Sequence, residues 1–149
     1  MSDLLKQVFV PWTLVMAGMM SLLSPGALNS ATAQQEHGCV KPETGVWTNA
    51  KASAKQITRI EVSTKCPGGT IYYRVRVFVK CAPRDCKWGW TDGLRYSNGR
   101  LIADFPGFFA AKRVEMSVAG DRMHINATNS FHDRTQPDQF HSAILKRIE

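Results

Sequence analysis

A strict alternation of apolar and polar side chains between Thr70 and Cys81 limits how this chain can fold more than any other feature. Successive residues of a strand point to opposite sides, so a period of two places every apolar residue of a strand on one face. One face here holds Ile71, Tyr73, Val75, Val77 and Val79, and the other holds Tyr72, Arg74, Arg76, Phe78 and Lys80. We therefore predict a strand with one side in a core and the other in water.

Further segments with this period follow one another along the chain. We predict strands in 45–49, 57–63, 101–105, 112–118, 123–128 and 140–148, and a loop in 50–56. In 57–63, the alternation puts Ile60 and Val62 on the face opposite to Ile57. Turn residues separate the strands at Pro67-Gly68-Gly69, Asn98-Gly99, Pro106-Gly107 and Gly120-Asp121. This pattern indicates an all-β sandwich or barrel. It favours a small antiparallel up-and-down β-barrel of seven or eight strands, which has no free edges.

The first residues have the features of an export signal. Lys6 precedes a mostly apolar stretch at 8–23, Ser24-Pro25-Gly26 interrupts it, and Ala31-Thr32-Ala33 is a signal-peptidase motif. The stretch is shorter than the about 20 residues of a membrane-spanning helix, although a retained anchor is the alternative. We predict a signal peptide at 1–33, an N-terminal segment at 34–44 and a single β-barrel domain at 45–149, secreted or periplasmic and without a membrane span once the signal is removed.

The chain has four cysteines, namely Cys39, Cys66, Cys81 and Cys86. An even number in an exported protein predicts two disulfides, for which three pairings exist. The turn-like Ala82–Asp85 segment favours a bridge between Cys81 and Cys86, which would leave Cys39 to pair with Cys66. The chain lacks the Cys-x2-Cys spacing that zinc sites and redox centres use, so a structural role is favoured.

Several short motifs support a resemblance. They are Gly45-Val46-Trp47-Thr48-Asn49, Ile57-Thr58-Arg59-Ile60, the segment Val77–Cys81 with Cys86-Lys87-Trp88-Gly89, and Phe140-His141-Ser142. The set resembles a family of small exported bacterial β domains with a G-x-W-x-N start, an I-T-R-[IV] strand and a V-W-G-K-C-x4-C-x-W-G block. This chain has Phe78-Val79 where the family has Trp-Gly. The resemblance implies export and an all-β fold but no activity. The opening is also similar to that of avidin-like barrels, from which no ligand is carried over.

The polar face of the 70–81 strand is the first candidate site. The chain carries a net charge of +7, and this face interleaves cations with aromatic rings. Guanidinium groups pair with phosphate or sulfate, and rings stack, so an anionic surface is a candidate partner. The candidate residues are Tyr72, Arg74, Arg76, Phe78 and Lys80, extended by Arg59. The alternative is an ordinary solvated outer wall. Export disfavours nucleic acid as a partner.

Tryptophans form the second candidate site. Trp47, Trp88 and Trp90 could line the mouth of a barrel and stack on a sugar or an apolar ligand. The alternative places Trp47 and one of Trp88 and Trp90 in the core, with the pair on opposite faces.

Histidines near the C-terminus form the third candidate. His124, His132 and His141, with Asp133 and Asp138 nearby, could meet on adjacent strands as a zinc or general-base site. Their spacing is loose, and no Ser–His–Asp set can be assembled. We assign no catalytic residue, no metal ligand and no cofactor.

These features together favour an exported, non-enzymatic binding protein. Its ligand would be a small hydrophobic or sugar molecule, or an anionic surface. The first alternative is an inhibitor or interaction protein that docks on a secreted enzyme. The second is a metal-dependent or hydrolytic enzyme that uses the C-terminal histidines. A cavity in the barrel would favour the first function, whereas a filled barrel with a protruding 82–96 loop would favour the interaction protein.

The export signal makes a testable prediction. We expect the mature protein to begin near Gln34, because Ala31-Thr32-Ala33 is the cleavage motif. Intact-mass analysis of the exported protein checks this. A mass that retains Met1, or a lipid on Cys39, would contradict it.

Overall fold

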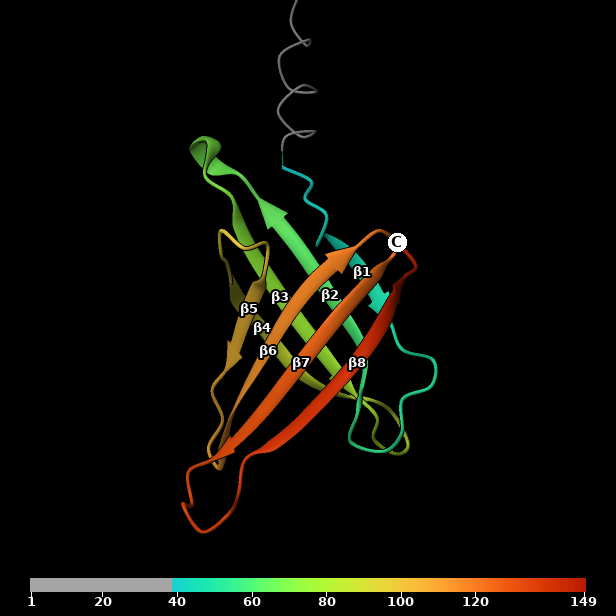
Figure 1. The fold of residues 1–149 in the computed structure, drawn as a ribbon, viewed down its shortest axis with the longest axis vertical. Helices are drawn as coiled ribbons and strands as arrows, with labels where there is room; N and C mark the ends of the chain where they lie inside the picture. The colour runs from blue at the N-terminus through green and yellow to red at the C-terminus, as the bar shows by residue number, and fades with distance from the viewer. Residues whose placement is uncertain (1–38) are drawn as a thin grey trace, which may run out of the picture. The chain divides into compact units, whose positions relative to one another are not determined.

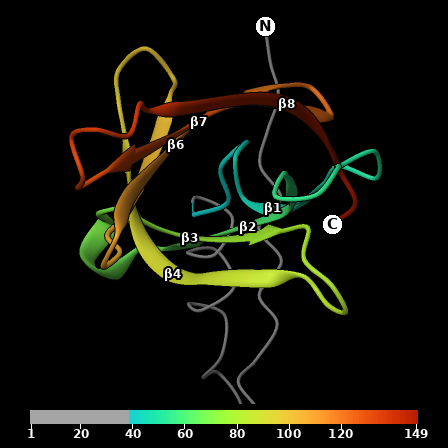
Figure 2. The same ribbon diagram turned by 90° about the horizontal axis from the view of Figure 1, so that it is seen from below.

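The chain forms a closed barrel of eight antiparallel strands, each paired with the next in sequence, and the last with the first (Figures 1 and 2). The computed structural model describes residues 39–149, so the predicted signal peptide lies outside the described residues. The strands are β1 Gly45–Thr48, β2 Ile57–Lys65, β3 Tyr72–Val79, β4 Cys86–Arg95, β5 Leu101–Phe105, β6 Ala110–Ala119, β7 Arg122–Phe131 and β8 Gln139–Arg147. This confirms the predicted up-and-down barrel.

A 3-10 turn over Pro67–Gly69 joins β2 to β3, and short loops make the other connections. Among residues 39–149 no helix combines the length and the apolar character that a membrane crossing would need.

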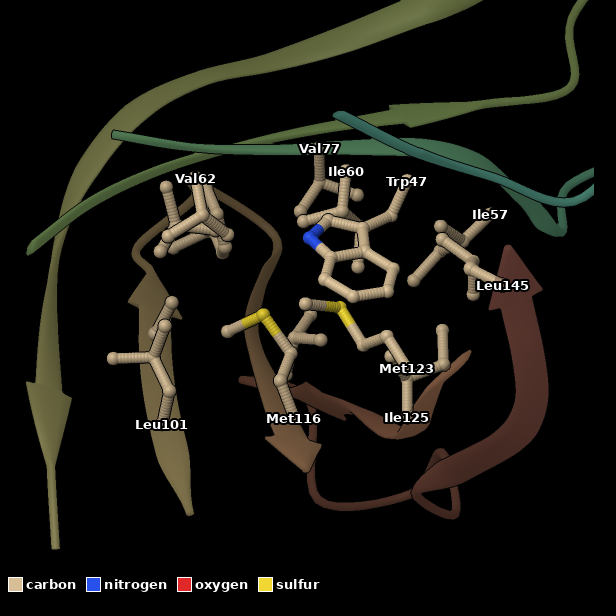
Figure 3. Close-up of a cluster of buried hydrophobic side chains, with 14 of the residues drawn as sticks. Trp47, Ile57, Ile60, Val62, Val77, Leu101, Met116, Met123, Ile125 and Leu145 are labelled. Atoms are coloured by element: carbon tan, nitrogen blue, oxygen red, sulfur yellow. The ribbon is translucent and has the colours of Figure 1, made fainter. Parts of the chain in front are cut away.

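Alternation fills the middle of the barrel with side chains. On β3, Tyr73, Val75, Val77 and Val79 are buried, as their spacing predicts. Figure 3 shows the Trp47 indole at the centre of this cluster. The largest fully buried side chains around it include Ile60, Leu101, Met116, Met123, Ile125 and Leu145. The centre of the barrel is therefore packed rather than hollow.

A bulge in β2 corrects one prediction. The pairing of β2 with β3 shifts between Ile57 and Arg59, so Thr58 is an extra residue opposite β3. An extra residue reverses the alternation on one side of it. Ile57 therefore faces the core with Ile60 and Val62 and is 2% exposed, although simple alternation put it on the other face.

A second bulge divides two tryptophans between the two faces of β4. The pairing of β3 with β4 shifts between Arg76 and Phe78, so that Trp88 and Gly89 together oppose one residue of β3. Gly89 has a φ of 83°, a left-handed conformation that residues with a side chain disfavour. Trp88 consequently packs inward and Trp90 points outward, which confirms that the pair lies on opposite faces.

The N-terminal segment 39–44 packs against one end of the barrel. A disulfide joins Cys39 to Cys66 across a sequence separation of 27, and the Thr64 hydroxyl donates to the Cys39 carbonyl at 2.8 Å. Glu43 is buried and accepts a hydrogen bond from Arg95 Nε at 2.8 Å. We call this end, formed also by the connections 66–71, 96–100 and 120–121, the closed end.

Titratable groups are coupled at the closed end. The hydrogen bond to Glu43 raises the pKa of the Arg95 guanidinium. Burial, and then the nearby Glu43 carboxylate, raise the pKa of the Tyr73 phenol. Both shifts keep Arg95 charged and Tyr73 neutral, so the Glu43 carboxylate has a cation beside it rather than a second anion.

Barrel closure depends on few residue pairs. β1 meets β8 through Trp47 opposite Arg147 and Thr48 opposite Lys146. Just beyond β8, the Val46 amide donates to the Glu149 carbonyl at 3.0 Å and the Val46 carbonyl accepts from the Ile148 amide at 2.9 Å. The Arg147 guanidinium carbon lies 4.1 Å from the centre of the Trp47 ring. The same guanidinium donates to the carbonyls of Thr44 and Pro42, and the Trp47 indole N–H donates to the Glu43 carbonyl at 2.9 Å. One arginine therefore joins the last strand, the first strand and the N-terminal segment.

The second disulfide lies at the opposite end. Cys81 and Cys86 are bridged across the connection between β3 and β4, so both favoured pairings are confirmed.

Gly45, at the start of β1, has a φ of 131°, and a Cβ there would lie 2.2 Å from the Glu149 carbonyl oxygen. The G-x-W motif therefore has a structural reason at both positions. Gly45 leaves room for the backbone of Glu149, and Trp47 is buried in the core.

Arg147 provides a stability test. We expect Arg147→Ala to lower the free energy of unfolding by about 2 kcal/mol, because it removes a cation–π contact and two hydrogen bonds at the closure. Lys146→Ala, on the adjacent exposed residue, is the control and should change it by less than about 0.5 kcal/mol. Urea unfolding measures both. Equal losses in the two variants would contradict a special role for Arg147.

Candidate functional site

A pocket opens at the end of the barrel opposite the N-terminal segment. We call this the open end; it is formed by the connections 49–56, 80–85, 106–109 and 132–138 (Figure 1). The pocket holds about 340 Å³. Its lining comes from six strands and from the 49–56 and 80–85 connections, and includes Gln56, Ile57, Val79, Cys81, Trp88, Lys112, Ala127, Asn129, Gln139, Phe140 and His141. Its volume lies within the range of about 300–1,000 Å³ that is typical of small-molecule sites.

One wall of the pocket is apolar and aromatic. Trp88 contacts the edge of Phe105, with ring centroids 5.3 Å apart, and this contact fixes the indole against the core. Lys112 Nζ lies 5.3 Å from the centre of the Trp88 ring. Ile57 and Val79 continue the apolar surface from the neighbouring strands. A ligand in the pocket would therefore meet one flat ring with a cation beside it.

The other wall contains two buried polar atoms without partners. Asn129 Oδ1 and His141 Nε2 are inaccessible to solvent and form no hydrogen bond with any residue of 39–149. A buried polar atom without a partner costs about 1–3 kcal/mol, so two in one pocket are unusual. The register places Asn129 opposite Gln139, and His141 opposite Ala127, so the two side chains share the inner face of β7 and β8.

Sequence reasoning missed Asn129 and assigned His141 to another site. A signal was present in the inward row of β7, which runs Met123, Ile125, Ala127 and then turns polar at Asn129. The row of β8 does the same from Leu145 through Ala143 to His141. Recognising the pocket also requires knowing that β7 and β8 are neighbours, and that the 49–56 loop lies at the same end.

The outer face of β3 is a ladder of stacked side chains. Arg59 lies 3.8 Å from the centre of the Phe78 ring, and Arg76 lies 4.7 Å from that of Trp90. Glu61 lies between the two arginines, accepting from Arg76 Nε at 2.9 Å and pairing with Arg59 at 3.2 Å. The arginines are therefore engaged within the barrel wall.

This ladder changes how some candidate residues can act. Phe78 does lie on the outer face, but the arginines cover it and leave it 4% exposed, so its ring is not open to a ligand. Trp47 is fully buried beneath Arg147, which excludes it from a ligand surface. Arg74 lies near Trp90 and 4.0 Å from Asp92, while Tyr72 and Lys80 are exposed. Of the three tryptophans, only Trp88 lines the open-end pocket.

The three histidines are not brought together. His124 lies on an exposed position of β7, opposite Ser117 and Ile144. His132 contacts the Gly107 carbonyl at 3.0 Å, and His141 lines the pocket. Residues 39–149 contain no group of three or more His, Cys, Asp or Glu side chains that could hold a metal ion.

Comparisons with protein-family models, with curated proteins and with solved structures find no match to this chain.

A substitution of Asn129 tests whether its unpartnered oxygen lowers the free energy of unfolding. We expect Asn129→Leu to raise the free energy of unfolding by about 1 kcal/mol, because an apolar side chain removes an unpaired buried acceptor. Asn126→Leu on the same strand is the control; Asn126 accepts from Ser142 Oγ at 2.7 Å, so its replacement should not stabilise the protein. Thermal and urea unfolding compare the two. A destabilised Asn129→Leu would show that the amide supports the fold.

Proposed function

We propose that this chain is an exported binding protein whose open-end pocket takes a small amphipathic molecule with hydroxyl groups, such as a sugar with an apolar substituent. The observation that carries the proposal is the meeting, in one pocket of about 340 Å³, of an apolar wall with two unpartnered polar atoms. Binding sites of this kind combine apolar surface with a few polar groups that fix the ligand's orientation.

The chemistry of the two walls supports this ligand class. A hydroxyl group can donate to Asn129 Oδ1 and can donate to or accept from His141 Nε2. Both atoms are closed to solvent in the free protein, so a ligand hydroxyl would satisfy them once these two lining side chains turn toward the pocket. The C–H face of a sugar ring, or an alkyl chain, would pack against Trp88 and Ile57. Lys112 adds a hydrogen-bond donor beside the indole.

Export is supported by two independent features. The first 33 residues have the pattern of a signal peptide, and the two disulfides are of the kind that persists in oxidising compartments. The motif resemblance to small exported bacterial domains agrees with both.

The alternatives have less support. An anionic partner on the outer face of β3 would have to compete with Glu61 for Arg59 and Arg76. An interaction protein agrees with the filled centre of the barrel but not with the 82–96 segment, because β4 occupies most of that segment instead of a protruding loop. An enzyme that combines the three histidines would need them to converge, whereas His124 lies on the outer face of β7, His132 contacts the Gly107 carbonyl and His141 lies on the inner face of β8.

The two tryptophans of β4 give a matched test of the pocket. We expect an alkyl glycoside to bind the unmodified protein, and Trp88→Leu to weaken this binding about tenfold, because the stacking surface is lost. Trp90→Leu removes an equal side chain from the outer face and should leave binding unchanged. Isothermal titration calorimetry, with free sugars and fatty acids as further ligands, measures these affinities.

Controls separate folding from binding. Trp88→Phe keeps a ring in place and should retain most of the affinity, and circular dichroism establishes that each variant is folded. The proposal fails if none of the three ligand types binds, or if Trp90→Leu weakens binding as much as Trp88→Leu does.

A further inference from the structure

Three phenylalanines are exposed at the open end. Phe108 is 89% exposed, Phe109 is 78% exposed and Phe140 is 77% exposed. Phe108 and Phe109 lie in the β5–β6 connection with ring centroids 4.9 Å apart, whereas Phe140 lies at the start of β8, on the rim of the pocket. Single exposed apolar residues are ordinary, but several at one end of a barrel indicate an interaction site.

The protein holds these rings at the rim through backbone contacts. The His132 amide donates to the Phe109 carbonyl at 3.0 Å, and His132 Nε2 lies 3.0 Å from the Gly107 carbonyl oxygen. The β5–β6 connection is thereby fastened to the β7–β8 connection beside it. The exposed pair therefore belongs to a braced part of the open end.

Cations lie at the same end of the barrel as the exposed rings. The loops and strand ends of the open end carry Lys51, Lys55, Lys80, Arg84, Lys87, Lys112 and Arg134. None of these takes part in an ion pair within residues 39–149. The acidic groups nearby are fewer: Asp85 accepts from Thr58, Asp133 from Thr135 and Asp138 from Ser130. These donors are neutral and the carboxylates keep their charge, so seven cations stand against three anions at this end. The open end thus combines apolar rings with unpaired positive charge.

We infer that the open end docks on the surface of an anionic lipid bilayer, with the three phenylalanine rings inserted at the headgroup level. Aromatic and aliphatic side chains bordered by lysine and arginine are the composition that binds at this interface. Protein–protein interfaces, in contrast, are depleted in lysine, and five of the seven cations here are lysines. This inference goes beyond the proposed function and does not depend on a ligand in the pocket.

Vesicles of phosphatidylglycerol and phosphatidylcholine test the inference. In co-flotation experiments we expect the protein to bind mixed vesicles, and to bind pure phosphatidylcholine vesicles at least about tenfold more weakly. F108S/F109S should lower the affinity for mixed vesicles by about tenfold or more. The control L94S/Y96S removes two exposed apolar side chains from the closed end and should change it little.

A second pair of variants tests the charges. K51Q/R84Q/R134Q removes three cations from the open end without touching the pocket lining, and should weaken vesicle binding. K65Q/R122Q/K146Q removes the same charge elsewhere and should weaken it distinctly less, since attraction falls off within a Debye length of about 10 Å. All of these positions are exposed, so thermal unfolding should be unchanged in each variant.

Three results would overturn the inference. They are no binding to mixed vesicles, equal losses in open-end and closed-end variants, and a concentration-dependent dimer that F108S/F109S abolishes. The dimer would identify a second copy of the chain as the occupant of this surface. Failure of glycoside binding alone would affect only the proposed function, because the vesicle experiments use no glycoside.

Discussion

The stacking of Arg147 on Trp47 is the contact on which the closed barrel depends. A barrel of eight strands must join its first strand to its last, and β1 has only four residues for this purpose. Two paired positions and the two backbone hydrogen bonds of Val46 with Ile148 and Glu149 form the seam, which is short for closing a sheet. The buried indole supplies apolar area that the short strand lacks, and the guanidinium above it ties the strand ends to the N-terminal segment.

The two ends of the barrel differ, because the N-terminal segment 39–44 packs against only one of them. At the closed end, Glu43 Oε1 accepts from Arg95 and the Trp47 N–H meets a carbonyl, whereas Glu43 Oε2 has no hydrogen-bond partner within residues 39–149. No comparable segment of residues 39–149 crosses the open end, whose loops leave Asn129 and His141 without partners. The open-end pocket lies between strand ends and loops, not in a hollow interior, and the closed end also has hollows, one of them beside the Cys39–Cys66 disulfide.

The sequence predicts the barrel well because each strand pairs with the strand that follows it in sequence. Alternation on β3 and the turn residues between strands place neighbours in sequence beside each other, and the short Cys81–Cys86 connection needs little more than a turn. Alternation fails at Thr58, where one extra residue moves Ile57 into the core. It is also incomplete for Phe78, whose ring lies on the outer face yet is buried, because arginines from two strands cover it.

The site is less predictable because it depends on which strand ends meet. Trp88 could be assigned to the interior or the exterior only once the bulge at Gly89 was known, and Asn129 acquires significance only beside His141 on the neighbouring strand. The exposed Phe108 and Phe109 look in sequence like part of a turn after Pro106-Gly107. They become a candidate interaction site only because they lie at the same end of the barrel as the pocket and the unpaired cations.

The disulfides fit a protein that keeps an unsatisfied pocket. Two unpartnered buried atoms cost about 1–3 kcal/mol each, which is a large part of the stability of a small domain. In the chain-entropy description, the two bridges contribute about 2 and about 3.6 kcal/mol, an amount of the same order. Their positions agree with this role: Cys39–Cys66 fastens the segment that covers the closed end, while Cys81 belongs to the pocket lining itself. A reducing environment should therefore affect both ends of the barrel, because each end carries one of the two bridges.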